Sequence, residues 1–294
     1  IAFVDADVMV RPDTLRRAAT LLTSNPGVDA VFGTFDAPPA SMGFVSQYRN
    51  LLLHYYHRRQ YGNASTFKAA CGVIRSAVFE STGGFDEWHF GRHQLEDLEL
   101  GRRLASLGHR IVMNPYIHAT HLKRWTLRSL IVSEIVDHAV PWMRLVNRLL
   151  TPTQDAARSL RATKTRNVAL TWVATALALP ALHQRNIIML LGALACLVLV
   201  VINNRSQLAF FRRERGLAFA VATIPLDILY YFISGLGVAA GWLAKQMLGE
   251  PRPSPVTEAF TEVPVKRWPP VPVKRVIDRY ASAGTAKERD LGPT

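Results

Sequence analysis

The chain opens with IAFVDADV at residues 1–8, and this stretch decides the fold class. Residues 1–4 are apolar, as in a buried strand, and they lead directly into Asp5 and Asp7. In open α/β sheets, ligands bind beyond the carboxyl ends of the strands. Two carboxylates at such an end can hold Mg²⁺ or Mn²⁺, because these ions prefer oxygen ligands together with substrate phosphates. The simpler alternative is a pair of solvated loop acids.

Strand and helix patterns alternate after this stretch. The expected elements are a helix at 13–24, a strand at 28–35, a helix at 44–61, a short strand and turn at 67–75, a short helix closed by Gly83-Gly84, a helix at 95–107 and a strand at 110–113. This alternation predicts an α/β domain with a mostly parallel sheet, and we expect the domain to cover residues 1–125.

A second pair of acids, Glu96 and Asp97, starts the helix predicted at 95–107. A positioned carboxylate can take the proton of an acceptor hydroxyl as general base, a contribution of roughly 10²–10⁴-fold in rate. The alternative is plain capping of the helix, because acids at this position also stabilise its free N–H groups. Considered without the rest of the sequence, the pair favours capping.

The end of the predicted domain reads HLKRW at residues 121–125. Its bases and its aromatic ring could hold a diphosphate and brace an acceptor channel. Trp-Lys-Arg clusters also anchor proteins at the edge of a membrane, which is the simpler interpretation of this segment alone.

Charge and cysteine usage limit the possible partners. The net charge is +13, from 35 Lys and Arg against 22 Asp and Glu, and basic residues crowd beside apolar segments at 158–166 and 205–215. That placement fits anionic lipid headgroups, and no zinc-finger or ribonucleoprotein motif is present, so we expect no nucleic-acid partner. The two cysteines, Cys71 and Cys196, lie in different regions and predict no disulfide framework.

The second half of the chain has the composition of a membrane region. Residues 126–150 are amphipathic, which predicts helices that either lie in the membrane interface or pack on the catalytic domain. Apolar runs at 167–182, 186–202 and 217–248 predict two to four spans, since about 20 apolar residues cross a bilayer.

This organisation divides the remainder of the chain into three parts. We expect interfacial helices and a basic linker at 126–166, a transmembrane region at 167–248 and a disordered, proline-rich tail at 249–294. The basic flanks place the first domain in the cytoplasm and the turn at 183–185 outside, by the positive-inside rule.

The motifs in their order resemble one family. DAD at 5–7, GGFDE at 83–87, ED at 96–97 and HLKRW at 121–125, with membrane spans after them, are similar to the family 2 inverting glycosyltransferases of the GT-A fold. That family includes cellulose, chitin and hyaluronan synthases and many membrane-associated bacterial cell-envelope enzymes. The resemblance covers roughly residues 1–125 and is specific for the family, not for a substrate.

The resemblance implies roles for the acids. Asp5 and Asp7 match the motif that binds a divalent metal, Mg²⁺ or Mn²⁺, and the donor diphosphate, with Asp7 as the direct ligand. Asp97 matches the catalytic base, and Glu96 is its neighbour.

The resemblance also implies roles for residues later in the domain. Arg124 and Trp125 match the end of the family's Gln-x-x-Arg-Trp motif at the donor, while His121 stands where processive members have Gln. Cys71 and Gly72 fall where members line the acceptor site.

The implied activity is transfer of a sugar from a UDP- or GDP-sugar, with inversion, to a lipid-linked or glycan acceptor at the cell (inner) membrane. The alternatives are a processive polysaccharide synthase, which His121 disfavours, and a non-catalytic scaffold or transport component with a degenerate transferase-like domain. Because the family's N-terminal half is absent, we expect the chain to be incomplete at its N-terminus and inactive by itself.

Overall fold

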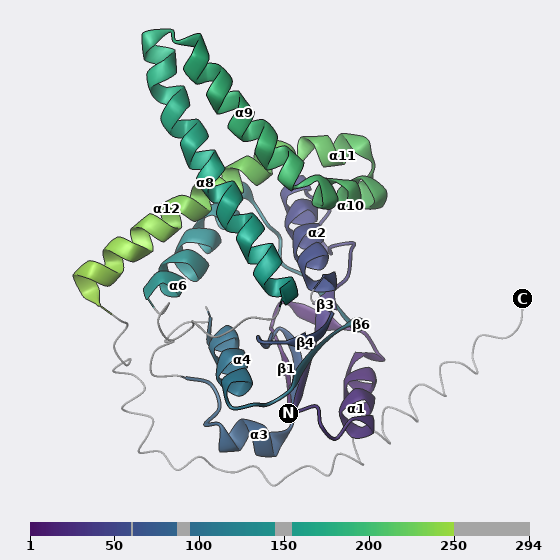
Figure 1. Cartoon of the computed structure of the whole chain (residues 1–294). Coiled ribbons are helices and arrows are strands. Elements are labelled where there is room, and N and C mark those ends of the chain that lie inside the picture. The colour runs from purple at the N-terminus through teal and green to yellow at the C-terminus, as the bar shows by residue number, and fades with distance from the viewer. Residues whose placement is uncertain (60, 87–94, 145–154, 250–294) are drawn as a thin grey trace, which may run out of the picture. The chain divides into compact units, whose positions relative to one another are not determined.

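The computed structural model describes residues 1–59, 61–86, 95–144 and 155–249 (Figure 1). The first part is built on strands, and their bounds are β1 Ala2–Val4, β2 Val8–Val10, β3 Ala30–Phe35, β4 Gly62–Ala64, β5 Cys71–Ile74 and β6 Ile111–His121. The helices among these strands are α1 Thr14–Ser24, α2 Phe44–Arg58, α3 Ser76–Ser81 and α4 Glu96–Ser106. The predicted helices and central strands are confirmed, and β2 and β4 were not predicted. The expectation that the strand at 1–4 is buried is wrong, because β1 is the edge strand of the sheet and Val4 is 42 % exposed.

The described strands form one mixed sheet in the order β1-β5-β3-β6-β2, with β4 also on β6. Only β3 and β6 pair in parallel, and the other pairings are antiparallel. The expectation of a mostly parallel sheet is therefore wrong. The alternation of strands and helices assumes that each new strand is added in the same direction, but β5 inserts between β1 and β3 and runs against both.

Strand β6 is longer than the strand predicted at 110–113, because it continues past Asn114-Pro115. Its pairing with β3 shifts register between Phe32 and Thr34. The residue between them is Gly33, where an added Cβ would lie 2.2 Å from the carbonyl oxygen of Ile117. The glycine therefore permits the close approach on which the second half of the parallel pairing depends.

Each face of the sheet carries its own hydrophobic core. On one face, Ala18 and Leu22 of α1 pack with Val31 of β3. On the other face, Leu100 of α4 packs with Phe32, the next residue of β3. Successive residues of a strand point to opposite faces, so the fully buried β3 holds α1 and α4 on opposite faces of the sheet (Figure 1).

The remaining described elements are helical. Their bounds are α5 Leu127–Val132, the π-helix η1 Ser133–Ala139, α6 Val140–Arg144, α8 Asp155–Gln184, α9 Ile187–Asn203, α10 Arg205–Arg215, α11 Leu217–Ala222 and α12 Ile224–Leu248. For residues 126–144 the sequence allowed two placements, and the structure packs them on protein. Leu130 of α5 joins a buried cluster with Tyr48 of α2, and Trp142 of α6 packs on Leu95 at the start of α4.

Fewer helices are long and apolar enough to cross a membrane than the sequence predicted. Among the described residues, one helical stretch, Leu217–Leu248, is long and apolar enough to cross a bilayer. The pair Ile187–Asn203 and Arg205–Arg215, bent by 61°, would make a second if it counts as one span. The segment 167–182 lies within α8, which is not a candidate by this measure, and residues 250–294 of the predicted tail lie outside the described residues.

A buried polar network joins α2 to the helices that follow the sheet. Asp227, near the start of α12, is 3 % exposed. Its carboxylate accepts hydrogen bonds from the Tyr48 hydroxyl on α2 (2.7 Å), from Gln207 on α10 (2.9 Å) and from Asn204 at the end of α9 (3.2 Å). The apolar run 217–248 therefore begins against protein, because this carboxylate is satisfied entirely by side chains from other elements.

Candidate active site

The acids predicted to bind metal lie in the turn between β1 and β2. The Val8 amide donates to the Asp5 carbonyl at 3.0 Å and closes this turn. Because β1 and β2 stand at opposite ends of the strand order, the turn crosses the edge of the sheet where β1, β3 and β6 end. Its two sides are fixed by the Asp5 amide, which donates to the Ala70 carbonyl (3.4 Å), and by the Asp7 carbonyl, which accepts from the Leu122 amide (2.8 Å).

Asp97 reaches the same edge from helix α4. It lies in the first turn of α4, and its Oδ2 accepts a hydrogen bond of 3.4 Å from the Ala69 amide. Its neighbour in the same turn, Glu96, is half-buried. The Ala69 amide thus contacts Asp97 while the next residue, Ala70, contacts Asp5, so segment 68–70 brings these two predicted site residues together.

The position of α4 depends on a glycine. A Cβ on Gly101 would lie 1.9 Å from the backbone nitrogen of Phe67 and 2.5 Å from the carbonyl carbon of Thr66. No side chain fits there, so α4 lies directly on the segment that precedes 68–70. This close approach is what places Asp97 within reach of Ala69.

His121 stands on the opposite side of the turn, at the end of β6. Its Nε2 lies 3.6 Å from Oδ2 of Asp7, and its ring stacks on Phe35 with centroids 4.6 Å apart. Burial lowers the pKa of His121 below its ordinary value, and the attraction of Asp7 only partly offsets this effect. The imidazole stands beside the carboxylate of Asp7 at a distance longer than a hydrogen bond.

Trp125 is 7 % exposed and is clamped by helix α2. The Ser46 hydroxyl accepts from the Trp125 amide at 2.8 Å and lies 3.2 Å from its carbonyl oxygen. The Arg49 guanidinium stands 5.5 Å from the Trp125 ring centroid, and the Lys123 ammonium stands 4.4 Å from it. Arg124 is exposed beside this cluster.

Cys71 and Gly72, predicted to line an acceptor site, belong to β5. Cys71 is 7 % exposed and packs in the core beneath α1, where burial raises the pKa of its thiol to about 11. A Cβ on Gly72 would lie 2.4 Å from the Lys68 carbonyl oxygen. Both residues therefore pack against segment 68–70. Their role toward an acceptor stays a prediction.

The residues at this edge fit a divalent ion that is shared with a diphosphate. Within the described ranges, no three His, Cys, Asp or Glu side chains form a cluster that could hold a metal by themselves. Mg²⁺ needs no such cage, because it is commonly held by one or two carboxylates together with substrate phosphates and waters. Asp5 and Asp7 in the turn at this edge of the sheet carry carboxylates of the kind that such an ion takes as ligands.

Sequence patterns missed three residues at this site. Lys68 places its Nζ 3.5 Å from Oδ2 of Asp97, and Ser46 and Arg49 hold Trp125. A lysine in FKAAC would have been a reasonable basic candidate. Nothing in the pattern of α2 indicates that Ser46 and Arg49 would pack against Trp125. This residue lies 79 positions after Ser46 and 76 positions after Arg49.

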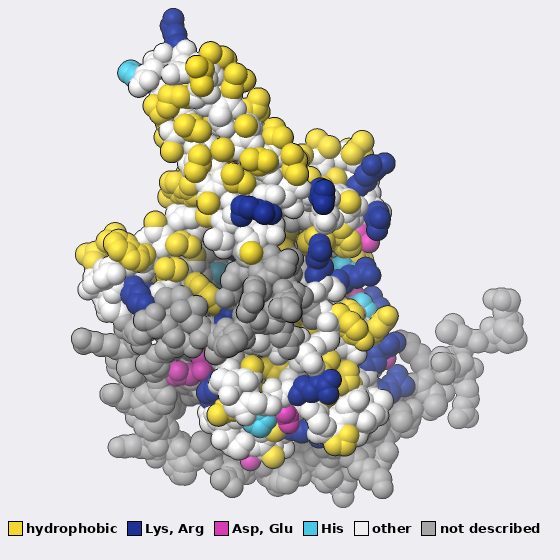
Figure 2. Space-filling view, in the orientation of Figure 1, with side chains coloured by type: hydrophobic (Ala, Val, Ile, Leu, Met, Phe, Trp, Pro, Cys, Tyr) yellow, Lys and Arg dark blue, Asp and Glu magenta, His cyan; other side chains and the backbone are white. Residues whose placement is uncertain are grey.

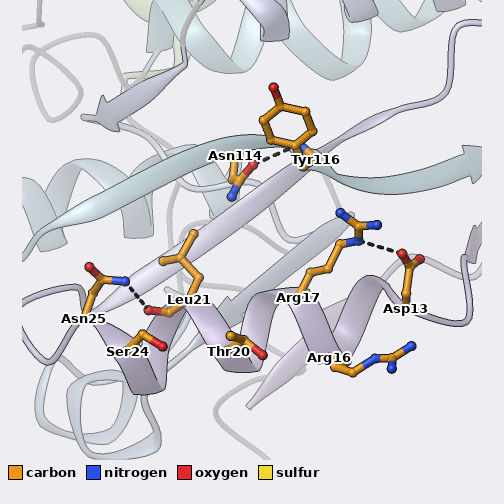
Figure 3. A pocket seen from close by; sticks show the side chains of 9 residues that line it. All are labelled: Asp13, Arg16, Arg17, Thr20, Leu21, Ser24, Asn25, Asn114 and Tyr116. Atoms are coloured by element: carbon orange, nitrogen blue, oxygen red, sulfur yellow. Dashed lines mark hydrogen bonds and ion pairs between the residues drawn. The ribbon is translucent and has the colours of Figure 1, made fainter.

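A separate hollow lies outside this site. It has a volume of about 620 Å³ and is lined by α1 and by a short part of β6 (Figure 3). In Figure 3, Arg17 pairs with Asp13 and the Asn25 side chain bonds the Leu21 carbonyl. None of the predicted site residues lines it.

Comparison with known protein families gave a match for the first part of the chain. Residues 1–134 match the model of a family described as glycosyltransferase like family 2. A search of curated proteins found no match to the chain. Residues 1–134, somewhat less than half of the chain, are therefore similar to the domain of that glycosyltransferase family.

Proposed function

We propose that this protein is a membrane-bound inverting glycosyltransferase, which moves a sugar from a UDP- or GDP-sugar onto a lipid-linked or cell-envelope acceptor. The observation that carries the proposal is that segment 68–70 contacts both the Asp5 backbone amide and the Asp97 carboxylate, while Nε2 of His121 lies 3.6 Å from the carboxylate of Asp7. Such a site offers oxygen ligands for a metal-bound diphosphate on one side and a carboxylate base on the other.

The proposed reaction is a single displacement at the anomeric carbon. Asp97 takes the proton of the acceptor hydroxyl as its oxygen bonds to the sugar, and the nucleoside diphosphate leaves from the opposite face. The Ala69 amide and Lys68 orient the carboxylate of Asp97. Mg²⁺ or Mn²⁺, held by Asp7 and Asp5, would offset the negative charge of the departing diphosphate.

The residues after β6 would position the substrates. His121 lies beside Asp7, and the exposed Arg124 and Lys123 would supply positive charge for phosphate oxygens. Trp125, fixed by Ser46, supplies a rigid wall for the acceptor. The match of residues 1–134 to the family model supports the proposal of these roles.

The membrane location is also part of the proposal. It is supported by the candidate span Leu217–Leu248 and by the basic stretch at 205–215 beside it. We place residues 1–134 on the cytoplasmic side of the cell membrane, because cytoplasmic flanks of membrane helices carry the excess of Lys and Arg.

The test is sugar-nucleotide turnover by the full-length protein in membranes. A panel of UDP- and GDP-sugars is supplied with Mn²⁺ or Mg²⁺, with and without a chelator, and with a membrane lipid extract as the source of acceptor. We expect turnover of one donor, lost with the chelator and restored by the metal. A protein that binds lipid extract and metal yet turns over no donor would favour the scaffold alternative.

A further inference from the structure

The guanidinium of Arg49 lies buried between two aromatic rings. Arg49 belongs to α2 and is 9 % exposed. Its Cζ stands 5.5 Å from the ring centroid of Trp125 and 5.9 Å from the ring centroid of Tyr230 on α12. Both distances fall within the roughly 6 Å over which a cation is attracted to the face of a ring. Arg49 therefore contacts both a predicted site residue and a residue of the candidate span Leu217–Leu248.

The indole ring of Trp125 depends on such contacts for its position. The hydrogen bonds with Ser46 fix the backbone of Trp125, whereas the indole Nε1 has no hydrogen-bond partner among the residues that the structure describes. Two cations lie against the ring, Lys123 and Arg49. Lys123 is exposed, and a contact between a cation and a ring is weaker in water than in a buried place. The buried Arg49 is therefore the cation that contributes more to fixing the ring.

The ring of Tyr230 is held in turn by α8 and η1. Its hydroxyl accepts a hydrogen bond of 2.7 Å from Nζ of Lys164 on α8. The same Nζ donates to the carboxylate of Glu134 on η1 at 2.8 Å. Glu134 is 5 % exposed and also accepts a 2.7 Å hydrogen bond from Ser234, one turn after Tyr230 on α12. These contacts fix the face that Tyr230 presents to Arg49.

The helices that hold Tyr230 have an apolar outer surface. Exposed hydrophobic side chains include Leu179 and Leu182 on α8 and Trp242 and Leu243 on α12. Figure 2 shows hydrophobic side chains over most of the part of this face formed by α8 and α9. The contact of Arg49 with Tyr230 therefore connects Trp125 to the part of the chain that we place in the membrane.

We propose that Arg49 and Tyr230 are positioning residues for sugar transfer, and that both act through Trp125. Tyr230 holds the guanidinium of Arg49, and Arg49 holds the indole ring against which the acceptor binds. This inference rests on the proposed function, in which Trp125 is the wall for the acceptor. It adds that a residue of the candidate membrane helix sets how well the acceptor binds, without contributing to the metal site or to the base.

The first test measures turnover by the full-length protein in detergent while the concentration of a membrane lipid extract, the source of acceptor, is varied. Arg49→Met removes the charge and keeps an unbranched side chain. The extract concentration for half-maximal turnover should rise about tenfold, because a desolvated contact between a cation and a ring is worth about that factor or more. The maximal rate and the half-maximal concentration of sugar-nucleotide should change less than about twofold, since only acceptor binding is weakened.

Matched variants separate positioning from a general loss of structure. Arg49→Lys keeps a cation and should stay within about threefold of wild type. Tyr230→Leu removes the second ring and should raise the half-maximal extract concentration about threefold or more, whereas Tyr230→Phe keeps the ring and should stay close to wild type. Arg59→Met is the control, because Arg59 lies on the same helix against the ring of Tyr55, 5.3 Å from its centroid, and should change nothing.

The second test needs no turnover. Fluorotryptophan is incorporated into the full-length protein, and fluorine NMR spectra are recorded in detergent, with Trp125→Phe to identify the resonance of Trp125. Arg49→Met and Tyr230→Leu should each shift or broaden that resonance, while Arg59→Met should leave it in place. Tyr230→Leu tests the same contact from α12 where Arg49→Met cannot be purified.

Two results would overturn the inference. One is an active Arg49→Met variant whose half-maximal extract concentration equals that of wild type. The other is a Trp125 resonance that stays unchanged in Arg49→Met or in Tyr230→Leu. A wild-type protein that turns over no donor is a different result, because it contradicts the proposed function itself, and the fluorine spectra then still test the hold of Arg49 on Trp125.

Discussion

The hydroxyl of Tyr48 donates a 2.7 Å hydrogen bond to Asp227, across 179 positions of sequence. Tyr48 lies on α2, the helix that also clamps Trp125 through Ser46, and Asp227 lies at the start of α12. The part of the chain that carries the sheet and the candidate membrane helix are therefore joined by a buried contact, two residues along α2 from the clamp on Trp125.

Removing the hydroxyl tests this connection. Tyr48→Phe leaves a buried carboxylate with one hydrogen bond fewer, which should lower the free energy of unfolding by about 1.5–3 kcal/mol. Thermal unfolding in detergent measures the change. Tyr55→Phe, on the same helix but at a contact with the exposed Arg59, should cost less than about 0.5 kcal/mol. Equal stability of the two variants would show that the Tyr48 contact does not hold the parts together.

Removing the carboxylate of Asp227 should lower the free energy of unfolding more than removing the Tyr48 hydroxyl does. Asp227→Ala leaves Tyr48, Gln207 and Asn204 without their acceptor, so we expect a loss of about 2–4 kcal/mol. In the Tyr48→Phe background the same change should cost less, because one donor is already gone. Additive losses in the double variant would contradict a shared network.

Gly101 tests whether the position of α4 sets the site. Gly101→Ala places a methyl group against the backbone of residues 66–67 and should cost about 1–3 kcal/mol by overpacking. Because the helix must shift away from segment 68–70, turnover should fall as well. Gly27→Ala, where nothing lies within 4 Å of the added Cβ, is the control and should change neither stability nor turnover. Normal turnover by the Gly101→Ala variant would show that the position of α4 does not affect catalysis.

The pH dependence of stability should include a contribution from His57. Burial, and then the nearby charges of Lys68, His54 and Arg49, lower the pKa of His57 to about 3. In the unfolded chain its pKa is about 6.5, so the unfolded state gains a proton first as the pH falls. The domain should lose up to about 2 kcal/mol between pH 6.5 and 5 from this group.

The measurement is thermal unfolding at a series of pH values. His57→Gln should flatten the decline below pH 6.5, whereas His109→Gln, on the surface beside Asp29, should keep it. A decline that is identical in wild type and His57→Gln would mean that other groups cause the acid sensitivity.

The metal site predicts a selective change in metal dependence. Asp7→Asn removes a charged oxygen ligand, so the Mn²⁺ concentration for half-maximal turnover should rise about tenfold or more. Titration of Mn²⁺ against turnover measures this shift. Asp13→Asn, at an exposed ion pair with Arg17, should leave the titration unchanged. If both variants respond alike, Asp7 is not a ligand.

Patterns among neighbouring residues were enough to predict most helices and the turn that carries Asp5 and Asp7. Apolar residues 1–4 followed by two aspartates predicted a strand and a turn, and the helix predicted at 95–107 corresponds to α4, Glu96–Ser106. These features depend on neighbouring residues, so their pattern is visible in one stretch of sequence.

The remainder of the fold depends on tertiary packing. The four residues of β5 alternate in the same way whichever direction the strand runs, so its antiparallel insertion could not be predicted. The continuation of β6 past Pro115 rests on pairing with β3 around Gly33. The contact of Lys68 with Asp97 and the clamp of Ser46 on Trp125 likewise join segments that are far apart in sequence.

Turnover of the identified sugar-nucleotide by Asp97→Asn, compared with Glu99→Gln, tests the central claim most directly. Both changes convert a carboxylate to an amide on α4, but Glu99 pairs with Arg103 and takes no part in the proposed reaction. We expect Asp97→Asn to lose roughly 10²–10⁴-fold in kcat while it stays folded, and Glu99→Gln to keep its activity. An Asp97→Asn variant with wild-type kcat would contradict the assignment of Asp97 as the base.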